Sequence, residues 1–250
     1  MAVDPIHQFQ IIDLFPVVKI GHTEIAFTNS AAYMAVAVVV IMLFLIGGTA
    51  RRSLVPGRLQ SAAELSYEFV ANTIRSTAGT EGMRFFPFVF TLFMFILVVN
   101  LIGLIPYTFT VTTHIVITAT LALSVFATVL VYGFWKNGLH FFNLFVPKGN
   151  PIYILPLIVF IEVLSFISRP ISHSVRLFAN MLAGHITLKV FASFITLLGG
   201  LGIFGMAGAT LPLALVVALT ALELLVAFLQ AYVFAILTCI YLNDAIHPGH

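Results

Sequence analysis

Long runs without charge constrain this chain more than any other feature. Residues 85–135 contain no Asp, Glu, Lys or Arg, and neither do residues 25–50. A helix that spans a bilayer needs about 20 mostly apolar residues, so the first of these stretches is too long for one span. Pro106 and the polar stretch 107–114 divide it and predict a two-helix hairpin over 85–135, with helices at about 86–105 and 115–134. The second stretch predicts a first span over 29–50.

The composition agrees with a chain that is mostly solvated by lipid. Hydrophobic residues make up 61% of the sequence and charged residues only 8%, whereas a soluble domain carries about 25% charged residues. The single cysteine, Cys239, excludes an internal disulfide. The net charge of +2, without a basic stripe, argues against a nucleic-acid partner. We therefore expect an all-α integral membrane protein that forms one membrane domain over 1–250.

The last two apolar stretches are unusually long. Residues 152–198 are apolar apart from a few internal charges, the glycine-rich stretch 199–208 predicts a loop, and Pro212 opens a final run to about 242. A helix of about 40 residues is near 60 Å long, which is twice the thickness of the hydrocarbon core. Such helices have to tilt steeply. The chain is thus expected to have about five membrane helices, with a tilted hairpin over 152–243.

Two further segments are not expected to span. Over 58–80, apolar residues recur at helical spacing with charges on the other side, which predicts an amphipathic helix at the membrane interface. Residues 138–147 are apolar but too short to cross, and indicate a re-entrant or interfacial segment. Residues 1–28 form the N-terminal segment, which carries only one Lys or Arg.

Lys and Arg positions predict the orientation of the chain. Basic residues gather after the first and third spans, and on the loop before the second: Arg51, Arg52, Arg58, Arg75, Arg84, Lys136 and Lys148. The opposite side has Lys19 alone. The N-terminus is therefore expected outside and the C-terminus in the cytoplasm, which agrees with an odd number of spans.

Charges inside the tilted hairpin fall on one stripe. Glu162, Arg169 and Arg176 are seven residues apart, so each lies within about 20° of the previous one around an ideal helix. Ser172 and Asn180 lie near the same stripe. A charged side chain deep in a bilayer costs about 2.5–3.5 kcal/mol on insertion scales, so an intramembrane arginine is by default functional. Arg176 is therefore the leading candidate residue.

Two more polar groups lie away from that stripe. His185 lies about half a turn around the helix from Arg176, and Glu223 and Gln230 are seven apart on the final helix. If the two helices pack antiparallel about residue 204, His185 and Glu223 each lie 19 residues from the turn and should be level and close. Arg176 and Gln230, 28 and 26 residues away, should also be level. Histidine and glutamate exchange protons, whereas arginine keeps its own, so this pattern favours a proton route.

These residues carry a family resemblance. Residues 168–185 (SRPISHSVRLFANMLAGH) resemble the arginine motif of subunit a of F-type ATP synthases, residues 229–242 (LQAYVFAILTCIYL) resemble its last helix, and residues 100–106 (NLIGLIP) are similar to its second-span motif. The resemblance covers about residues 30–245. Many family members carry Glu where this chain has His185 and His where it has Glu223, so the pair looks exchanged here.

The resemblance implies a stator channel beside a rotating ring of c subunits, with the peripheral-stalk subunit b and the rest of the complex as further partners. It implies that Arg176 faces a ring carboxylate between two aqueous half-channels, with Asn180 and Gln230 nearby. Glu162 and Ser165 would lie towards the cytoplasmic exit, and His185 and Glu223 on the entry route. It also implies a non-catalytic subunit in a bacterial plasma membrane, without a cofactor or metal; no Walker-type motif is present.

Two other classes remain as alternatives. A stand-alone secondary transporter would be expected to contain inverted repeats and paired broken helices, and the two halves of this chain do not match in pattern. An intramembrane enzyme or quinone-reactive subunit would need a catalytic or metal-ligand constellation. Co-purification with a ring of small hairpin proteins would separate the stator subunit from both.

Overall fold

The computed structural model describes residues 11–20, 23–50, 53, 55–105, 108–146 and 153–247. Within these ranges the chain is almost entirely helical, which confirms the predicted all-α membrane class. Five helices are long and apolar enough to cross a membrane, so this is a multi-pass membrane protein. Arg51, Arg52 and Lys148, which entered the orientation argument, lie outside the described residues.

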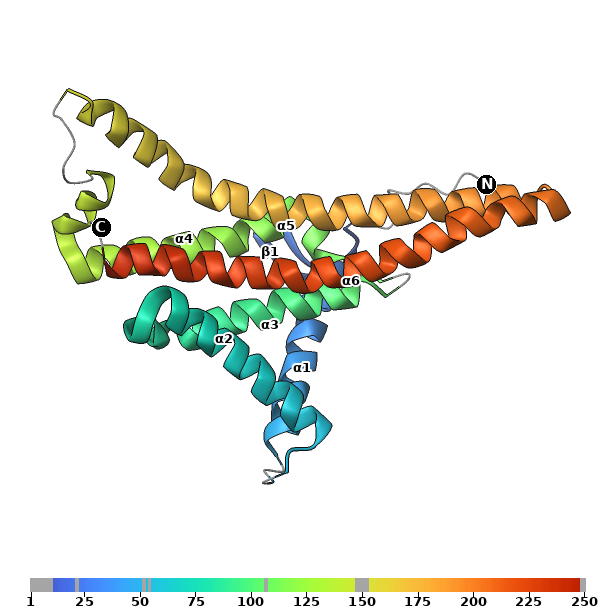
Figure 1. Cartoon of the computed structure of the whole chain (residues 1–250), viewed down its shortest axis with the longest axis horizontal. Coiled ribbons are helices and arrows are strands. Elements are labelled where there is room, and N and C mark those ends of the chain that lie inside the picture. Colours follow the sequence, from blue (N-terminus) through green and yellow to red (C-terminus); the bar gives the residue numbers. More distant parts are fainter. Residues whose placement is uncertain are drawn as a thin grey trace. The chain divides into compact units, whose positions relative to one another are not determined.

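The long helices follow the apolar runs (Figure 1). Their bounds are α1 Asn29–Thr49, α2 Arg58–Gly82, α3 Phe86–Gly103, α4 Ile115–Asn137, α5 Leu155–Gly199 and α6 Ile203–Ile246. Short 3-10 turns separate or extend them: η2 Met83–Phe85, η3 Val111–Thr113 and η4 Gly138–Phe145. Residues 138–147, which were expected to form a short apolar segment after the third span, contain the 3-10 helix η4. This helix begins at Gly138, whose φ of +53° is readily adopted by glycine.

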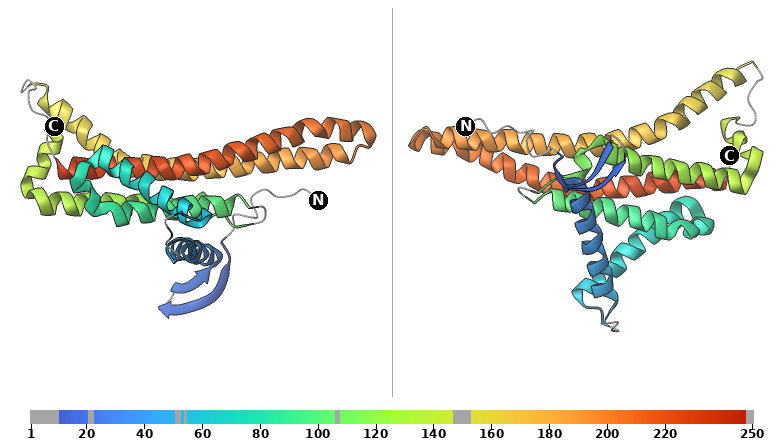
Figure 2. Two further views of the ribbon diagram at one scale, coloured as in Figure 1. Left: turned by 60° about the horizontal axis from the view of Figure 1, so that its bottom comes forward. Right: turned by 180° about the vertical axis from the view of Figure 1, so that it is seen from behind.

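A β-hairpin precedes α1 and was not expected from the sequence. Strand β1 (Asp13–Ile20) pairs antiparallel with β2 (Thr23–Thr28), and the register joins Asp13 to Thr28 and Ile20 to Thr23. The amide of Asn29 donates to the carbonyl of Ile12, which ties the hairpin to the first turn of α1. Figure 2 shows the two strands beside the N-terminal end of α1.

Helix α2 carries both buried and exposed residues. Val70 and Ile74 are fully buried, whereas Glu64 and Glu68 are exposed. The helix is interrupted near its end, because Gly79 has a φ of +66°. Its position at a membrane interface stays a prediction.

The turn between α5 and α6 is shorter than the sequence suggested. Helix α5 ends at Gly199 and α6 already begins at Ile203, so Gly205, Gly208 and Pro212 lie within α6 rather than in a loop. The expectation that Pro212 opens the last helix was therefore wrong. Gly202 carries the turn, with a φ of +81° that other residues rarely adopt.

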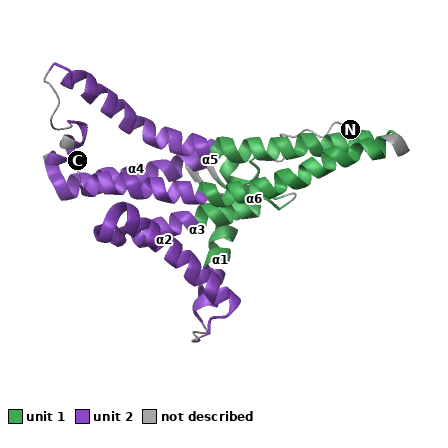
Figure 3. Cartoon of the chain, viewed as in Figure 1, with its two compact units in different colours: residues 1–41, 95–114, 177–230 green, residues 42–94, 115–176, 231–250 purple. Residues whose placement is uncertain are grey.

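The chain divides into two compact units, each assembled from separate stretches (Figure 3). Unit 1 comprises 1–41, 95–114 and 177–230, and unit 2 comprises 42–94, 115–176 and 231–250. The core of unit 1 includes Ala37, Ile96, Val99, Leu177, Met181 and Ala227, and that of unit 2 includes Val70, Ile74, Val89, Val125, Val129, Phe141 and Leu242. Many large apolar side chains remain exposed on the long helices, as lipid-facing surfaces require.

Candidate functional site

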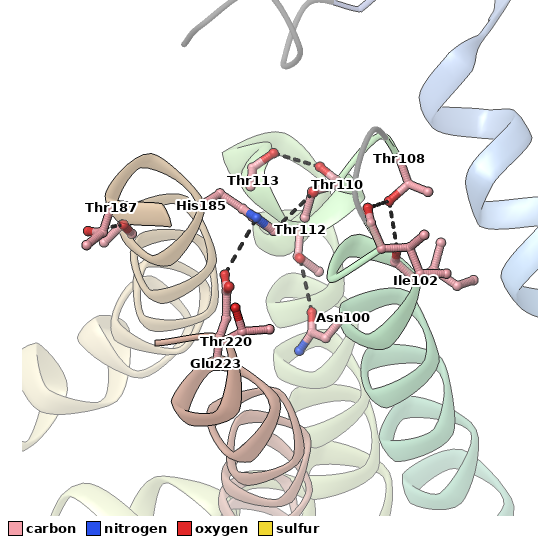
Figure 4. Close-up of polar contacts among 12 residues, drawn as sticks. Asn100, Ile102, Thr108, Thr110, Thr112, Thr113, His185, Thr187, Thr220 and Glu223 are labelled. Atoms are coloured by element: carbon pink, nitrogen blue, oxygen red, sulfur yellow. Dashed lines mark hydrogen bonds and ion pairs between the residues drawn. The ribbon is translucent and has the colours of Figure 1, made fainter. Parts of the chain in front are cut away.

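His185 of α5 and Glu223 of α6 face each other in unit 1 (Figure 4). The Nδ1 atom of His185 lies 3.6 Å from Oε1 of Glu223, and the two side chains are 11% and 6% exposed. The predicted proximity of this pair is confirmed. Neither carboxylate oxygen of Glu223 accepts a hydrogen bond from a described residue, and the histidine ring is a protonatable group that the structure places beside it.

Gly184 allows this close approach. A Cβ atom on Gly184 would lie 2.6 Å from Oε1 and 3.2 Å from Cδ of Glu223. Real Cβ atoms do not come so near to other heavy atoms, so any other residue would displace the carboxyl group. Gly184 therefore leaves room for the Glu223 carboxyl group, and the next residue, His185, provides the imidazole beside it.

The connection between α3 and α4 forms a third side of this cluster. The Thr110 hydroxyl lies 3.1 Å from Nε2 of His185. Two residues further on, the Thr112 hydroxyl donates to Oδ1 of Asn100 over 3.0 Å. Thr110 and Asn100 are completely buried, so these are interior contacts of unit 1.

His114 is the last residue of the same connection, directly before α4. Its ring stacks on Phe109 with centroids 5.0 Å apart, and Phe109 also packs against Tyr33 of α1. Burial lowers the pKa of His114, which lies between the spans, and so favours the neutral ring. The residue is half-buried and packs on Phe109.

Asn180 and Gln230 form a second polar pair in unit 1. The Nδ2 atom of Asn180 donates to Oε1 of Gln230 over 3.3 Å. Gln230 is 6% exposed, whereas Asn180 is exposed. The antiparallel register that brings His185 to Glu223 thus also joins these two amides.

Arg169 is held in an ion pair in unit 2. Its Nη1 atom lies 2.7 Å from Oδ2 of Asp244, and the side chains are 18% and 26% exposed. The guanidinium group also lies over the rings of Phe166 and Tyr241, at 5.2 Å and 5.0 Å from their centroids. Arg169 is therefore fixed by neighbours, which its place on the sequence stripe did not reveal.

The remaining predicted site residues line an open face of α5. Ser165, Ser172 and Arg176 are exposed and Glu162 is half-buried. Among the residues that the structure describes, the side chains of Glu162, Ser172 and Arg176 make no hydrogen bond or ion pair. These residues are not brought into the clusters described above.

His173 is a buried residue of the same helix. It is 4% exposed, and its ring centroid lies 3.7 Å from that of Phe234. The described residues contain no cluster of three His, Cys, Asp or Glu side chains that could hold a metal ion.

Sequence reasoning missed Thr110, Thr112, Asp244 and Gly184. Hydroxyl contacts from a connecting segment have no periodicity, and Thr110 is 75 residues away from His185 in the chain. Asp244 offered a signal, because an acidic residue at the end of an apolar helix invites a search for a basic partner, and Arg169 was available.

Comparison with known proteins shows which family the chain belongs to. Residues 31–243 match the family described as ATP synthase A chain. The chain is similar to "ATP synthase subunit a" of Rhodopseudomonas palustris strain BisB18, with 72% identity over 99% of this chain and 100% of the relative. It is also similar to "ATP synthase subunit a" of Nitrobacter winogradskyi, with 72% identity over 99% of both chains. With a family match over most of its length and relatives of such high identity, the chain belongs to the ATP synthase A chain family.

Proposed function

We propose that this chain moves protons through two half-channels that meet at Arg176, facing a rotating ring of c subunits. The chain is the proton-translocating stator subunit of the ATP synthase membrane sector, and it does not itself carry out ATP chemistry. A stand-alone transporter, the alternative from the sequence, is not supported, because the relatives are ATP synthase subunits.

The observation that carries the proposal is the exposure of Arg176 on a membrane helix. A permanently charged group that faces hydrocarbon is costly, so this face needs a partner that brings a negative charge. Ser172 and Asn180, one turn away on either side, are exposed as well. A ring of subunits with a membrane carboxylate meets this requirement, and peripheral-stalk subunit b is a further partner that the family resemblance implies.

The physical mechanism follows from this arrangement. A protonated ring carboxyl is neutral and can face lipid, whereas Arg176 favours the ionised form beside it. The released proton leaves past Glu162 and Ser165 on the cytoplasmic side. Another proton enters past His185 and Glu223, with Asn180 and Gln230 near the junction. Because arginine does not give up its own proton, Arg176 also blocks a direct leak between the two paths.

Rotation sums the small energy of each proton. One elementary charge that crosses 100 mV releases about 2.3 kcal/mol, so several crossings are needed for each ATP. We place the N-terminus outside and the C-terminus in the cytoplasm of a bacterial plasma membrane. In this assignment Arg169 and its partner Asp244 stabilise the cytoplasmic end of the path rather than carry protons.

Site-directed cross-linking tests the ring contact. In a background where the buried Cys239 is replaced by serine, Ser172→Cys should cross-link to a small hairpin protein in membranes that contain the whole complex. Ser174→Cys, two residues away but 4% exposed, is the matched control and should not react. Cross-linking at position 174 and not at 172 would contradict the proposed face.

A further inference from the structure

We propose that Thr110 is a positioning residue for proton transfer, which holds the His185 ring so that Nδ1 faces Glu223 in both protonation states of the imidazole. This inference rests on the proposed function of the His185–Glu223 pair. It assigns a role to a residue of the α3–α4 connection, which is separate from the arginine stripe on α5 and from α6.

The geometry places His185 between two groups. The Thr110 hydroxyl is 3.1 Å from Nε2, and Glu223 Oε1 is 3.6 Å from Nδ1 on the opposite side of the ring. Figure 4 shows the three side chains in this order. A contact at Nε2 therefore fixes where Nδ1 points, as partners of one ring nitrogen generally set the state of the other.

Thr110 is itself held rigidly. Its side chain is fully buried, and its carbonyl accepts a hydrogen bond of 2.6 Å from the Thr113 hydroxyl. It packs so closely on α3 that a Cβ on Gly103 would lie 2.8 Å from Thr110 Cγ2. These contacts hold the Thr110 backbone in place, so that its hydroxyl points towards His185 of α5.

The chemistry of a hydroxyl suits a group that gains and loses a proton. A threonine O–H rotates, and it both donates and accepts hydrogen bonds. It donates to Nε2 when the imidazole is neutral with its proton on Nδ1, and it accepts from Nε2–H when the ring is charged. The same contact therefore persists through a protonation cycle, which a donor-only or acceptor-only side chain would not allow.

Neighbouring threonines are engaged elsewhere. The Thr112 hydroxyl donates to Asn100, and the Thr113 hydroxyl donates to the carbonyl of Thr110. Their contacts support the connection, whereas Thr110 is the member of this run that the structure places against the imidazole. A loss of function that is specific to position 110 is therefore expected.

The test uses membrane vesicles that contain the whole ATP synthase, with ATP-driven proton pumping as the readout. Thr110→Val keeps the shape and removes the hydroxyl, and should slow pumping about three- to tenfold, as expected for one lost hydrogen bond. Thr110→Ser should restore most of the rate. Thr187→Val is the matched control, because the Thr187 hydroxyl bonds to the Ala183 carbonyl of its own helix, and should pump normally.

A double-mutant cycle separates positioning from general packing. In a His185→Ala background, Thr110→Val should cause little further loss, because the ring that it positions is gone. A full additional loss in that background, or normal pumping by Thr110→Val alone, would overturn the proposal. Failure of the proposed function would look different, since coupled pumping would then survive in Arg176→Ala.

Nitrogen NMR of the ¹⁵N-histidine-labelled complex gives an independent readout. The His185 signals are those that disappear in His185→Ala. Thr110→Val should shift the Nε2 signal of His185, and Thr187→Val should leave it in place. An unchanged His185 spectrum in Thr110→Val would refute the positioning role even where pumping in the His185→Ala background is too slow to measure.

Discussion

His185 Nδ1 and Glu223 Oε1 lie 3.6 Å apart on two different long helices, in side chains that are almost fully buried. The two residues are 38 positions apart in the chain, on either side of the turn at residues 200–202. A histidine and a carboxyl group at this distance exchange a proton directly or through one water molecule. In the proposed function, this pair lies on the proton entry route.

Exchanging the two residues tests whether they act as a pair. His185→Ala or Glu223→Ala should slow ATP-driven proton pumping without uncoupling ATP hydrolysis from it, because access is impaired while Arg176 remains. The double exchange, His185→Glu with Glu223→His, should retain more pumping activity than either single exchange, since the pair keeps its composition. A double exchange no better than the worse single variant would argue against direct coupling.

Gly184 provides a test that separates function from stability. Gly184→Ala should displace the Glu223 carboxyl, because the new Cβ would lie 2.6 Å from its Oε1. The carboxyl is the end of a flexible side chain and moves easily, so the melting temperature of the complex should change little while pumping falls several-fold. Gly208→Ala is the control, since a Cβ there meets no atom within 4 Å. Equal pumping rates in the two variants would contradict this account of Gly184.

The Arg169–Asp244 ion pair should contribute to stability. Both side chains are mostly buried, so Asp244→Asn leaves Arg169 without its counter-charge and should destabilise the protein by about 1–3 kcal/mol. The measurement is the thermal denaturation midpoint of the purified complex. The exposed pair of Lys136 and Glu81 is the control: Glu81→Gln should leave the midpoint unchanged, as is usual for surface ion pairs. Equal shifts in both variants would show that burial does not set the value of these pairs.

The sequence predicted the helices because charge-free runs in a membrane protein have few alternatives. It also predicted the His185–Glu223 contact from an antiparallel pairing about residue 204, although the structure places the turn itself at residues 200–202. The β-hairpin of β1 and β2 escaped prediction, since among the described residues its strands pair only with each other and not with a larger sheet. Pro212 misled the placement of the last helix, because proline is tolerated in membrane helices as well as at their starts.

The contacts of Thr110 and Asp244 could not be derived in the same way. These contacts depend on which connecting segment packs against which helix. The spacing of residues within a single helix or loop gives no information about such packing. Arg169 illustrates the limit, because its seven-residue spacing from Arg176 predicted only that the two lie on one stripe. The structure instead gives Arg169 a carboxylate partner and two aromatic neighbours, while Arg176 stays exposed.

The central claim is that Arg176 is the charge around which coupling is organised, and one measurement tests it most directly. Arg176→Ala should abolish ATP-driven proton pumping and ATP synthesis in membrane vesicles, while the complex still assembles with normal subunit content. Arg176→Lys should fail as well, because lysine is a compact charge that deprotonates when it is desolvated. Normal coupled pumping by assembled Arg176→Ala complexes would contradict the account.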